Sequence, residues 1–147
     1  MALTEQMITR SKHVEVTGCT IKTGDDCMSI EDGTENLHVK NIVCGPGHGI
    51  SIGTLGDQNS EAHVTIATVD TNMIMENVWN PIVVDQNYCD SATPCKEQFR
   101  LISNVLFKNI RGTSASKEAI KLDCSKNVPC QGIALKNINL TVKGRQW

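Results

Sequence analysis

The sequence predicts an all-β solenoid, in which short strands stack in successive repeats. A motif of alternating apolar residues, followed by Asn or Gly and then an aliphatic residue or Cys, recurs along the chain. A second short strand follows most copies of this motif. No segment keeps the 3.6-residue period of a helix, and Gly, Asn, Asp and Ser fill the gaps between strands. Short strands that return about every 20–40 residues between turns are typical of solenoids.

The main motif is found at residues 14–19, 37–42, 73–78, 105–110 and 133–138. Gly18, Asn41, Asn77, Asn109 and Asn137 hold the same place in these copies. The accompanying strands are predicted at 27–30, 49–52, 81–85 and 119–123, and alternation with period two indicates one buried face for each. An antiparallel sandwich also has short strands and is the alternative. The recurring Asn favours stacked repeats, because amides at equivalent positions can form a ladder.

Length and composition restrict the function. The 147 residues are enough for one domain, expected to span residues 1–147. The formal net charge is -2 and no run of Lys or Arg occurs, so we expect no binding to nucleic acid or anionic membranes. No apolar stretch approaches the length of a membrane span.

Seven cysteines are many for this length, and two pairs have the same spacing. Five residues separate Cys89 from Cys95 and Cys124 from Cys130, and each pair brackets a loop that contains proline. Zinc ligands are usually closer in sequence, so loop-closing disulfides and an oxidising compartment are the better interpretation. The odd number leaves one thiol unpaired. Residues 1–6 show no basic and apolar signal-peptide regions, so we expect the chain to lack its beginning.

Reactive side chains gather in two segments, Thr23–Cys27 and Cys44–Gly53. Asp26 and His48 are 22 residues apart, close to one repeat, which predicts neighbouring strands about 4.8 Å apart. Two adjacent carboxylates raise the pKa of one of them, and an acid with a base is what glycoside hydrolysis needs. The simpler interpretation of Asp25 and Asp26 is a turn, which aspartate favours.

His48 lies between Gly47 and Gly49. A turn residue or an internal histidine with satisfied hydrogen bonds is the simpler interpretation, but the glycines leave room for a ligand to approach the ring. A metal site built from Asp25, Asp26 and His48 has no supporting ligand-spacing motif, so we expect no metal and no cofactor.

Several motifs together resemble the plant polygalacturonases, the pectin-cleaving glycosidases of family 28. The similarity covers nearly the whole chain from about residue 11. The motifs that carry it are Gly24–Cys27, Cys44–Gly53, Asn59–Val64, Asn80–Cys89, Thr93–Lys96, Gly112–Ser116, Asp123–Ser125 and Pro129–Gly132.

The resemblance implies a right-handed parallel β-helix, here partial, with a substrate groove along one face. It implies hydrolysis of α-1,4-galacturonosyl bonds in pectin with inversion and without a cofactor, by a protein secreted to the cell wall. Asp25 matches the general acid, Asp26 matches a carboxylate that activates water, and His48 matches the histidine that supports the acid. Gly47 and Gly49 fall in the part of the motif expected to meet substrate.

The same resemblance implies three disulfides and one free thiol. Cys27 pairs with Cys44 to brace the two active repeats, and Cys19 stays free. The other pairs implied are Cys89 with Cys95 and Cys124 with Cys130.

The sequence departs from the family pattern in two places. An Asn-Thr-Asp motif with a third Asp is expected one repeat before Gly24, but residues 1–11 contain no Asp. An Arg-Ile-Lys motif expected to bind the substrate carboxylate is also absent. Thr68 and Asn77, taken as equivalent positions of successive repeats, are only nine residues apart, which is too few to complete a turn of the solenoid. This predicts that one repeat is missing.

We therefore expect impaired hydrolysis. The alternatives are a catalytically inactive β-helix that binds pectin and a truncated isoform without a function. The protein is expected to be a monomer whose exposed end repeats favour self-association.

Overall fold

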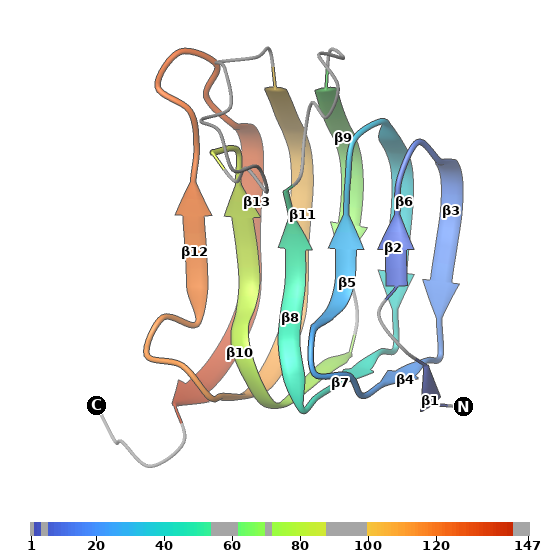
Figure 1. The fold of residues 1–147 in the computed structure, drawn as a ribbon, viewed down its shortest axis with the longest axis vertical. Coiled ribbons are helices and arrows are strands. Elements are labelled where there is room, and N and C mark those ends of the chain that lie inside the picture. Colours follow the sequence, from blue (N-terminus) through green and yellow to red (C-terminus); the bar gives the residue numbers. More distant parts are fainter. Residues whose placement is uncertain (1, 4–5, 54–61, 70–71, 88–99, 143–147) are drawn as a thin grey trace.

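The structure is a computed structural model that describes residues 2–3, 6–53, 62–69, 72–87 and 100–142. Every element within these residues is a strand, so none of them forms a helix able to cross a membrane. Each strand pairs in parallel with its neighbours, and the strands form the walls of a partial β-helix (Figure 1). The predicted all-β solenoid is confirmed.

The strands stack in three columns, and the chain visits each column once per turn. The first column holds β1 (Ala2–Leu3), β4 (Thr20–Ile21), β7 (Val43–Cys44), the start of β10 (Met73–Asp85), and the ends of β11 (Arg100–Ser114) and β13 (Gln131–Val142). The second holds β2 (Gln6–Ile8), β5 (Asp26–Ile30), β8 (Gly47–Ile52), the end of β10, and β12 (Ile120–Asp123). The third holds β3 (Lys12–Thr17), β6 (Thr34–Lys40), β9 (Ala62–Val69), and the starts of β11 and β13.

Rows of aliphatic side chains fill the space between the columns. Met28, Ile50 and Ile82 are in register on β5, β8 and β10, and all three are fully buried. The period-two alternation explains this row, because every second side chain of a strand points inward. Burial of large side chains at about 1.5–3 kcal/mol each drives the stacking.

The predicted amide ladder forms at the corner where the third column leads to the first. Asn137 donates from Nδ2 to Oδ1 of Asn109 over 2.7 Å, and Asn72 donates to Oδ1 of Asn41 over 3.5 Å. All four residues have left-handed backbones, with φ between 53° and 60°. Asn tolerates this conformation better than most residues, which explains its recurrence at the corner.

The predicted ladder is wrong for one of its asparagines, Asn77. Asn72, not Asn77, stands at this corner, because Met73 and Met75 stack in the first column. Asn77 lies farther along β10 at a different corner, where its backbone N–H donates to Oγ1 of Thr113 over 2.8 Å. The repeat pattern placed Asn77 wrongly, because strands in different columns show the same alternation of apolar residues.

The spacing argument for a missing repeat is also wrong in its premise. Thr68 and Asn77 are not equivalent positions, because β9 lies in the third column and β10 begins in the first column. β9 stacks on β6, and β10 stacks on β7 and β8. The stack of described strands therefore continues through this junction without a gap.

Candidate active site

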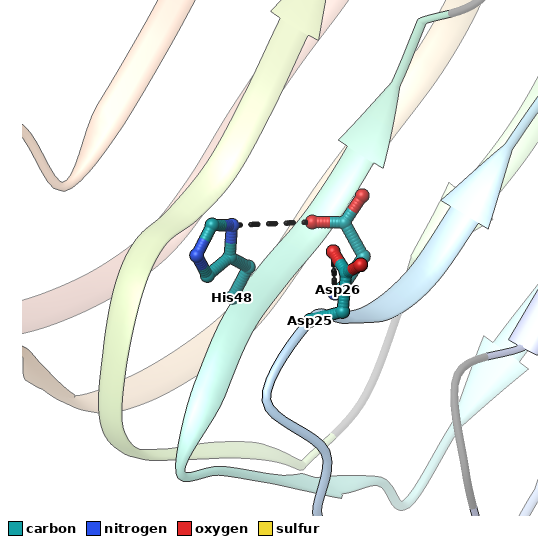
Figure 2. Close-up of side chains that lie close together, drawn as sticks. All are labelled: Asp25, Asp26 and His48. Atoms are coloured by element: carbon teal, nitrogen blue, oxygen red, sulfur yellow. Dashed lines mark hydrogen bonds and ion pairs between the residues drawn. The ribbon is translucent and has the colours of Figure 1, made fainter.

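Asp25, Asp26 and His48 meet on the outward face of the second column. Asp26 begins β5 and is in register with His48 on β8, as the repeat length predicts. Nδ1 of His48 lies 3.8 Å from Oδ1 of Asp26 (Figure 2). One ligand atom from each of the three side chains lies within 4.8 Å of the others. The side chains of Asp25 and His48 are exposed to solvent, so a substrate can reach them.

A local turn places Asp25 ahead of β5. Its backbone N–H donates to Oγ1 of Thr23 over 2.9 Å, and the Thr23 hydroxyl donates to the carbonyl oxygen of Asp25 over 2.6 Å. The Asp25 carboxylate accepts the backbone N–H of Asp26 over 2.8 Å. These short-range bonds are the ones that aspartate and threonine make in turns. The turn interpretation is therefore confirmed, and a catalytic role for the pair stays a prediction.

Asp26 is the partly buried member of the pair. Burial raises the pKa of its carboxyl above the usual aspartate value, and the charge of Asp25 acts in the same direction. A hydrogen bond from the Ser51 hydroxyl, 2.8 Å from Oδ2, opposes the pKa rise, as does the charge of His48. Desolvation is the largest of these effects because it disfavours the ionised form.

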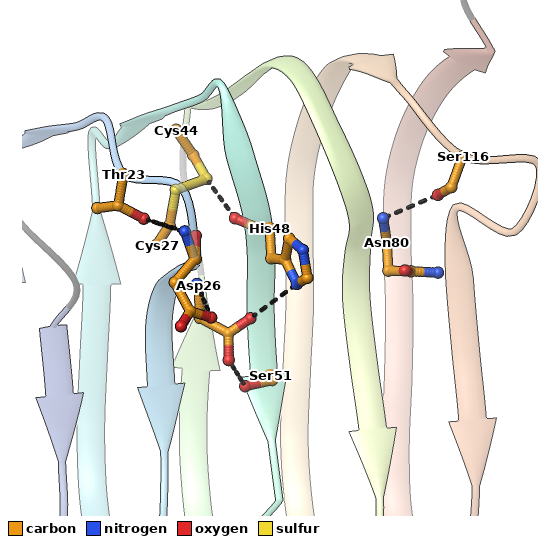
Figure 3. A network of polar contacts seen from close by, with 9 residues as sticks. Thr23, Asp26, Cys27, Cys44, His48, Ser51, Asn80 and Ser116 are labelled. Carbon is orange, nitrogen blue, oxygen red and sulfur yellow. Dashed lines mark hydrogen bonds and ion pairs between the residues drawn. A yellow bond between two sulfur atoms is a disulfide. The ribbon is translucent and has the colours of Figure 1, made fainter.

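A disulfide joins the two strands beneath the site. Cys27 of β5 and Cys44 of β7 are bonded and fully buried (Figure 3). The Cys44 sulfur lies 3.6 Å from the carbonyl oxygen of His48, and the His48 N–H donates to the carbonyl oxygen of Asp25 over 2.9 Å. The backbone at the site is therefore tied both covalently and by hydrogen bonds.

Both glycines beside His48 are buried between turns. A Cβ at Gly47 would lie 2.5 Å from the carbonyl oxygen of Thr23, and Gly47 has a φ of 148°. A Cβ at Gly49 would lie 2.2 Å from the carbonyl oxygen of Pro81. Close approach of neighbouring backbones therefore explains both glycines. Contact between either glycine and a substrate stays a prediction.

The other cysteines divide between described and undescribed residues. Cys124 and Cys130 form a disulfide, and Cys19 is a free thiol. The predicted pair of Cys89 and Cys95 lies outside the described residues.

Sequence reasoning missed Ser51 as a part of the site. Ser51 follows Asp26 by 25 residues, which is slightly more than one turn, and both side chains point outward on neighbouring strands. The repeat length could have predicted this contact, because residues about one repeat apart lie on neighbouring strands. Asp25, Asp26 and His48 are also the described residues that could hold a metal ion, although such exposed acidic groups commonly occur without one.

Comparison with known proteins agrees with the motifs. The model of glycosyl hydrolases family 28 matches residues 6–74 and 65–147. A polygalacturonase of Persea americana is 47% identical over 167 residues, which include 93% of this chain and 36% of the relative. Polygalacturonase-2 of Solanum lycopersicum is 43% identical, with 90% of this chain and 36% of the relative covered. Polygalacturonase QRT2 of Arabidopsis thaliana is 40% identical, with 95% and 38% covered.

These alignments are longer than the chain. The alignment of 167 positions includes 93% of the 147 residues, about 137, so about 30 positions of the relative have no counterpart here. The two matches with the family model overlap at residues 65–74, which points to the junction of β9 and β10 as the place of a missing segment. The chain spans about 36% of the length of the first two relatives. With a family model that matches nearly all of its residues, this chain belongs to glycosyl hydrolases family 28.

Proposed function

We propose that this chain hydrolyses α-1,4-galacturonosyl bonds of pectin with inversion, at a reduced rate. The observation that carries the proposal is the cluster of Asp25, Asp26 and His48 on an accessible face of a family 28 chain. Polygalacturonase is also the printed name of its relatives.

Each side chain has a role that its position supports. Asp25 is exposed and donates a proton to the glycosidic oxygen. Asp26 activates the attacking water, because a carboxyl with a raised pKa is a stronger base once it is ionised. Nδ1 of His48 lies 3.8 Å from Oδ1 of Asp26, so His48 stabilises the negative charge of Asp26.

The separation of the two carboxylates explains why the rate is reduced. Inverting glycosidases hold their carboxyls about 6.5–9.5 Å apart to leave room for water. One oxygen of Asp25 and one oxygen of Asp26 lie within 4.8 Å of each other, which is closer than that spacing. A third carboxylate one turn earlier would supply the longer distance, and residues 1–11 hold no Asp.

The short separation also favours a second function, binding of pectin without cleavage. In that case the exposed cluster contacts the substrate but does not cleave it. In both cases pectin or polygalacturonate is the partner. The proposed location is the extracellular cell wall, and the two disulfides fit an oxidising compartment.

Release of reducing sugar from polygalacturonic acid tests the proposal. Asp25→Asn and Asp26→Asn should each lower the rate by about 10²–10⁴-fold, because each removes a proton-transfer group. Glu15→Gln is the matched control, since Glu15 is an exposed carboxylate in the third column. Activity of the unchanged chain should rise as the pH rises through the elevated pKa of Asp26. Equal rates in all four proteins would contradict the assignment, and binding without product would support the second function.

A further inference from the structure

Two exposed apolar side chains lie on the same face as the catalytic cluster. The large apolar side chains that are exposed among the described residues belong to Met7, Trp79, Leu122 and Leu135. Leu122 and Leu135 are in register with the buried residues Val84 and Phe107, so they continue interior rows at the last described strands. Trp79 and Met7 need another explanation.

Trp79 continues the outward row of the catalytic cluster. In the second column Asp26 of β5 is in register with His48 of β8, and His48 is in register with Trp79 of β10. Residues in register on parallel strands point to the same face, and each strand adds about 4.8 Å. Trp79 therefore stands about 5 Å along the helix axis from His48 and about 10 Å from Asp26. Its side chain is 54% exposed, which is unusual for a residue of this size.

Met7 lies on the other side of the cluster. It is in register with Ser29 of β5, whose side chain faces outward, and it is 62% exposed. Three strand spacings, about 14 Å, separate the strand of Met7 from that of Trp79. This length suits a short oligosaccharide better than a single sugar.

The backbone that follows Trp79 is fixed. The N–H of Asn80 donates to Oγ of Ser116 over 2.8 Å, as Figure 3 shows, and Nδ2 of Asn80 donates to the carbonyl oxygen of Glu118 over 2.8 Å. Pro81 packs against Gly49 so closely that no side chain fits between them. A rigid aromatic ring loses little entropy when it binds a ligand, which suits Trp79 to a binding surface.

We propose that Trp79 is the stacking surface for a pyranose ring next to the bond that the cluster acts on. The C–H face of a pyranose is apolar and packs on an indole ring, while the sugar hydroxyls stay hydrated. This inference rests on the proposed function, because it assumes that a galacturonan chain lies along the second column.

Stacking on Trp79 recognises the apolar face of the sugar ring and does not depend on the charge of the substrate carboxylate. Lys121 is the lysine of strands β5, β8, β10 and β12, and its Nζ lies 3.2 Å from Oδ2 of Asp85. Within these four strands the lysine is therefore already paired with a carboxylate. Trp79 therefore accepts galacturonate and its neutral methyl ester with similar affinity.

The stacking of β10 on β8 brings Trp79 next to His48. The overlap of the two family-model matches points to a missing segment at the junction of β9 and β10, which precedes this contact.

Calorimetric titration with an oligogalacturonide and with its methyl-esterified form tests this inference on the full chain. Trp79→Ala should weaken binding of both forms by about tenfold or more, since an aromatic contact is lost. Trp79→Phe should stay within about threefold, because a ring remains. Leu135→Ala is the matched control, as Leu135 is an exposed apolar residue of the third column. Circular dichroism checks that each variant is folded.

The outcomes separate the inference from the proposed function. Unchanged affinity in Trp79→Ala, with binding by the parent chain, would overturn the role of Trp79 and leave the proposed function standing. Binding of a neutral galactan oligomer that depends on Trp79, without binding of galacturonides, would support the stacking surface and overturn the proposed substrate. Absence of binding to all three probes would overturn both. Tenfold weaker binding of the ester by the parent chain would refute charge-independent recognition.

Discussion

Asp26 shows how one residue combines fold and chemistry. Its place at the start of β5 half-buries the carboxyl, and Ser51 of the next turn supplies one hydrogen bond. The pKa of Asp26 is raised because desolvation outweighs that bond and the charge of His48. The folded protein therefore holds the neutral form of Asp26 more readily than the unfolded chain does.

The raised pKa of Asp26 predicts that the free energy of unfolding depends on pH. Near pH 3, below the usual aspartate pKa of about 3.9, Asp26 is protonated in both folded and unfolded states. As the pH rises through the elevated folded pKa, the charge must be buried and the stabilisation is lost. Asp26→Asn should therefore gain free energy of unfolding relative to the parent chain between pH 3 and pH 7, measured by urea denaturation.

Ser51→Ala provides the companion measurement. Without the Ser51 hydroxyl the pKa of Asp26 should rise further, so the chain should lose more stability over the same pH interval. A stability advantage of the Asp26→Asn variant that shrinks as the pH rises would be incompatible with a raised pKa.

At the scale of strands, the contact between β8 and β10 positions both His48 and Trp79. Gly49 makes this contact possible, because a Cβ there would lie 2.2 Å from the carbonyl oxygen and 2.4 Å from the Cα of Pro81. These are backbone atoms, so they cannot rotate away. The two strands would have to separate to accept a methyl group.

Gly49→Ala should therefore destabilise the protein by about 1–3 kcal/mol, the usual range for overpacking. Gly24→Ala is the matched control in the same site region, because nothing lies within 4 Å of a Cβ at Gly24. Its effect should stay within about 0.5 kcal/mol. Urea denaturation measures both, and equal losses in the two variants would show that the contact with Pro81 is not decisive.

At the scale of the whole molecule, the disulfides tie the turns together to different degrees. Cys27 and Cys44 are 17 residues apart, join strands of different turns and are buried in the core. Cys124 and Cys130 are only 6 residues apart and close a local loop. A longer closed loop removes more entropy from the unfolded chain.

Paired replacement by alanine should reveal this difference. Loss of the Cys27–Cys44 bond should cost about 3 kcal/mol and loss of the Cys124–Cys130 bond about 2 kcal/mol, by the chain-entropy relation. Core packing adds to the first cost, because both sulfurs are buried. Urea denaturation of the two double variants gives the comparison, and the reverse order would mean that the first bond does not brace the stack.

The sequence by itself determined the stack of parallel strands and the meeting of Asp26 with His48. Alternation with period two marks strands, and in a stacked fold a separation of about one repeat is a spatial contact. The recurrence of Asn also predicted stacked amides, and the structure adds the reason for it, since the left-handed backbone there admits few residue types. Three of the four asparagines predicted to stack, Asn41, Asn109 and Asn137, take part in the amide contacts of one column edge.

Only the tertiary structure decided which wall each strand joins and which side chains share a row. Met73 belongs to the first column and Asn72 takes the corner, although the alternation alone placed Asn77 there. The contact between Ser51 and Asp26 and the alignment of Trp79 with His48 likewise depend on register. The physical reason is that period two is the same on every wall, whereas turns of unequal length set the register between repeats.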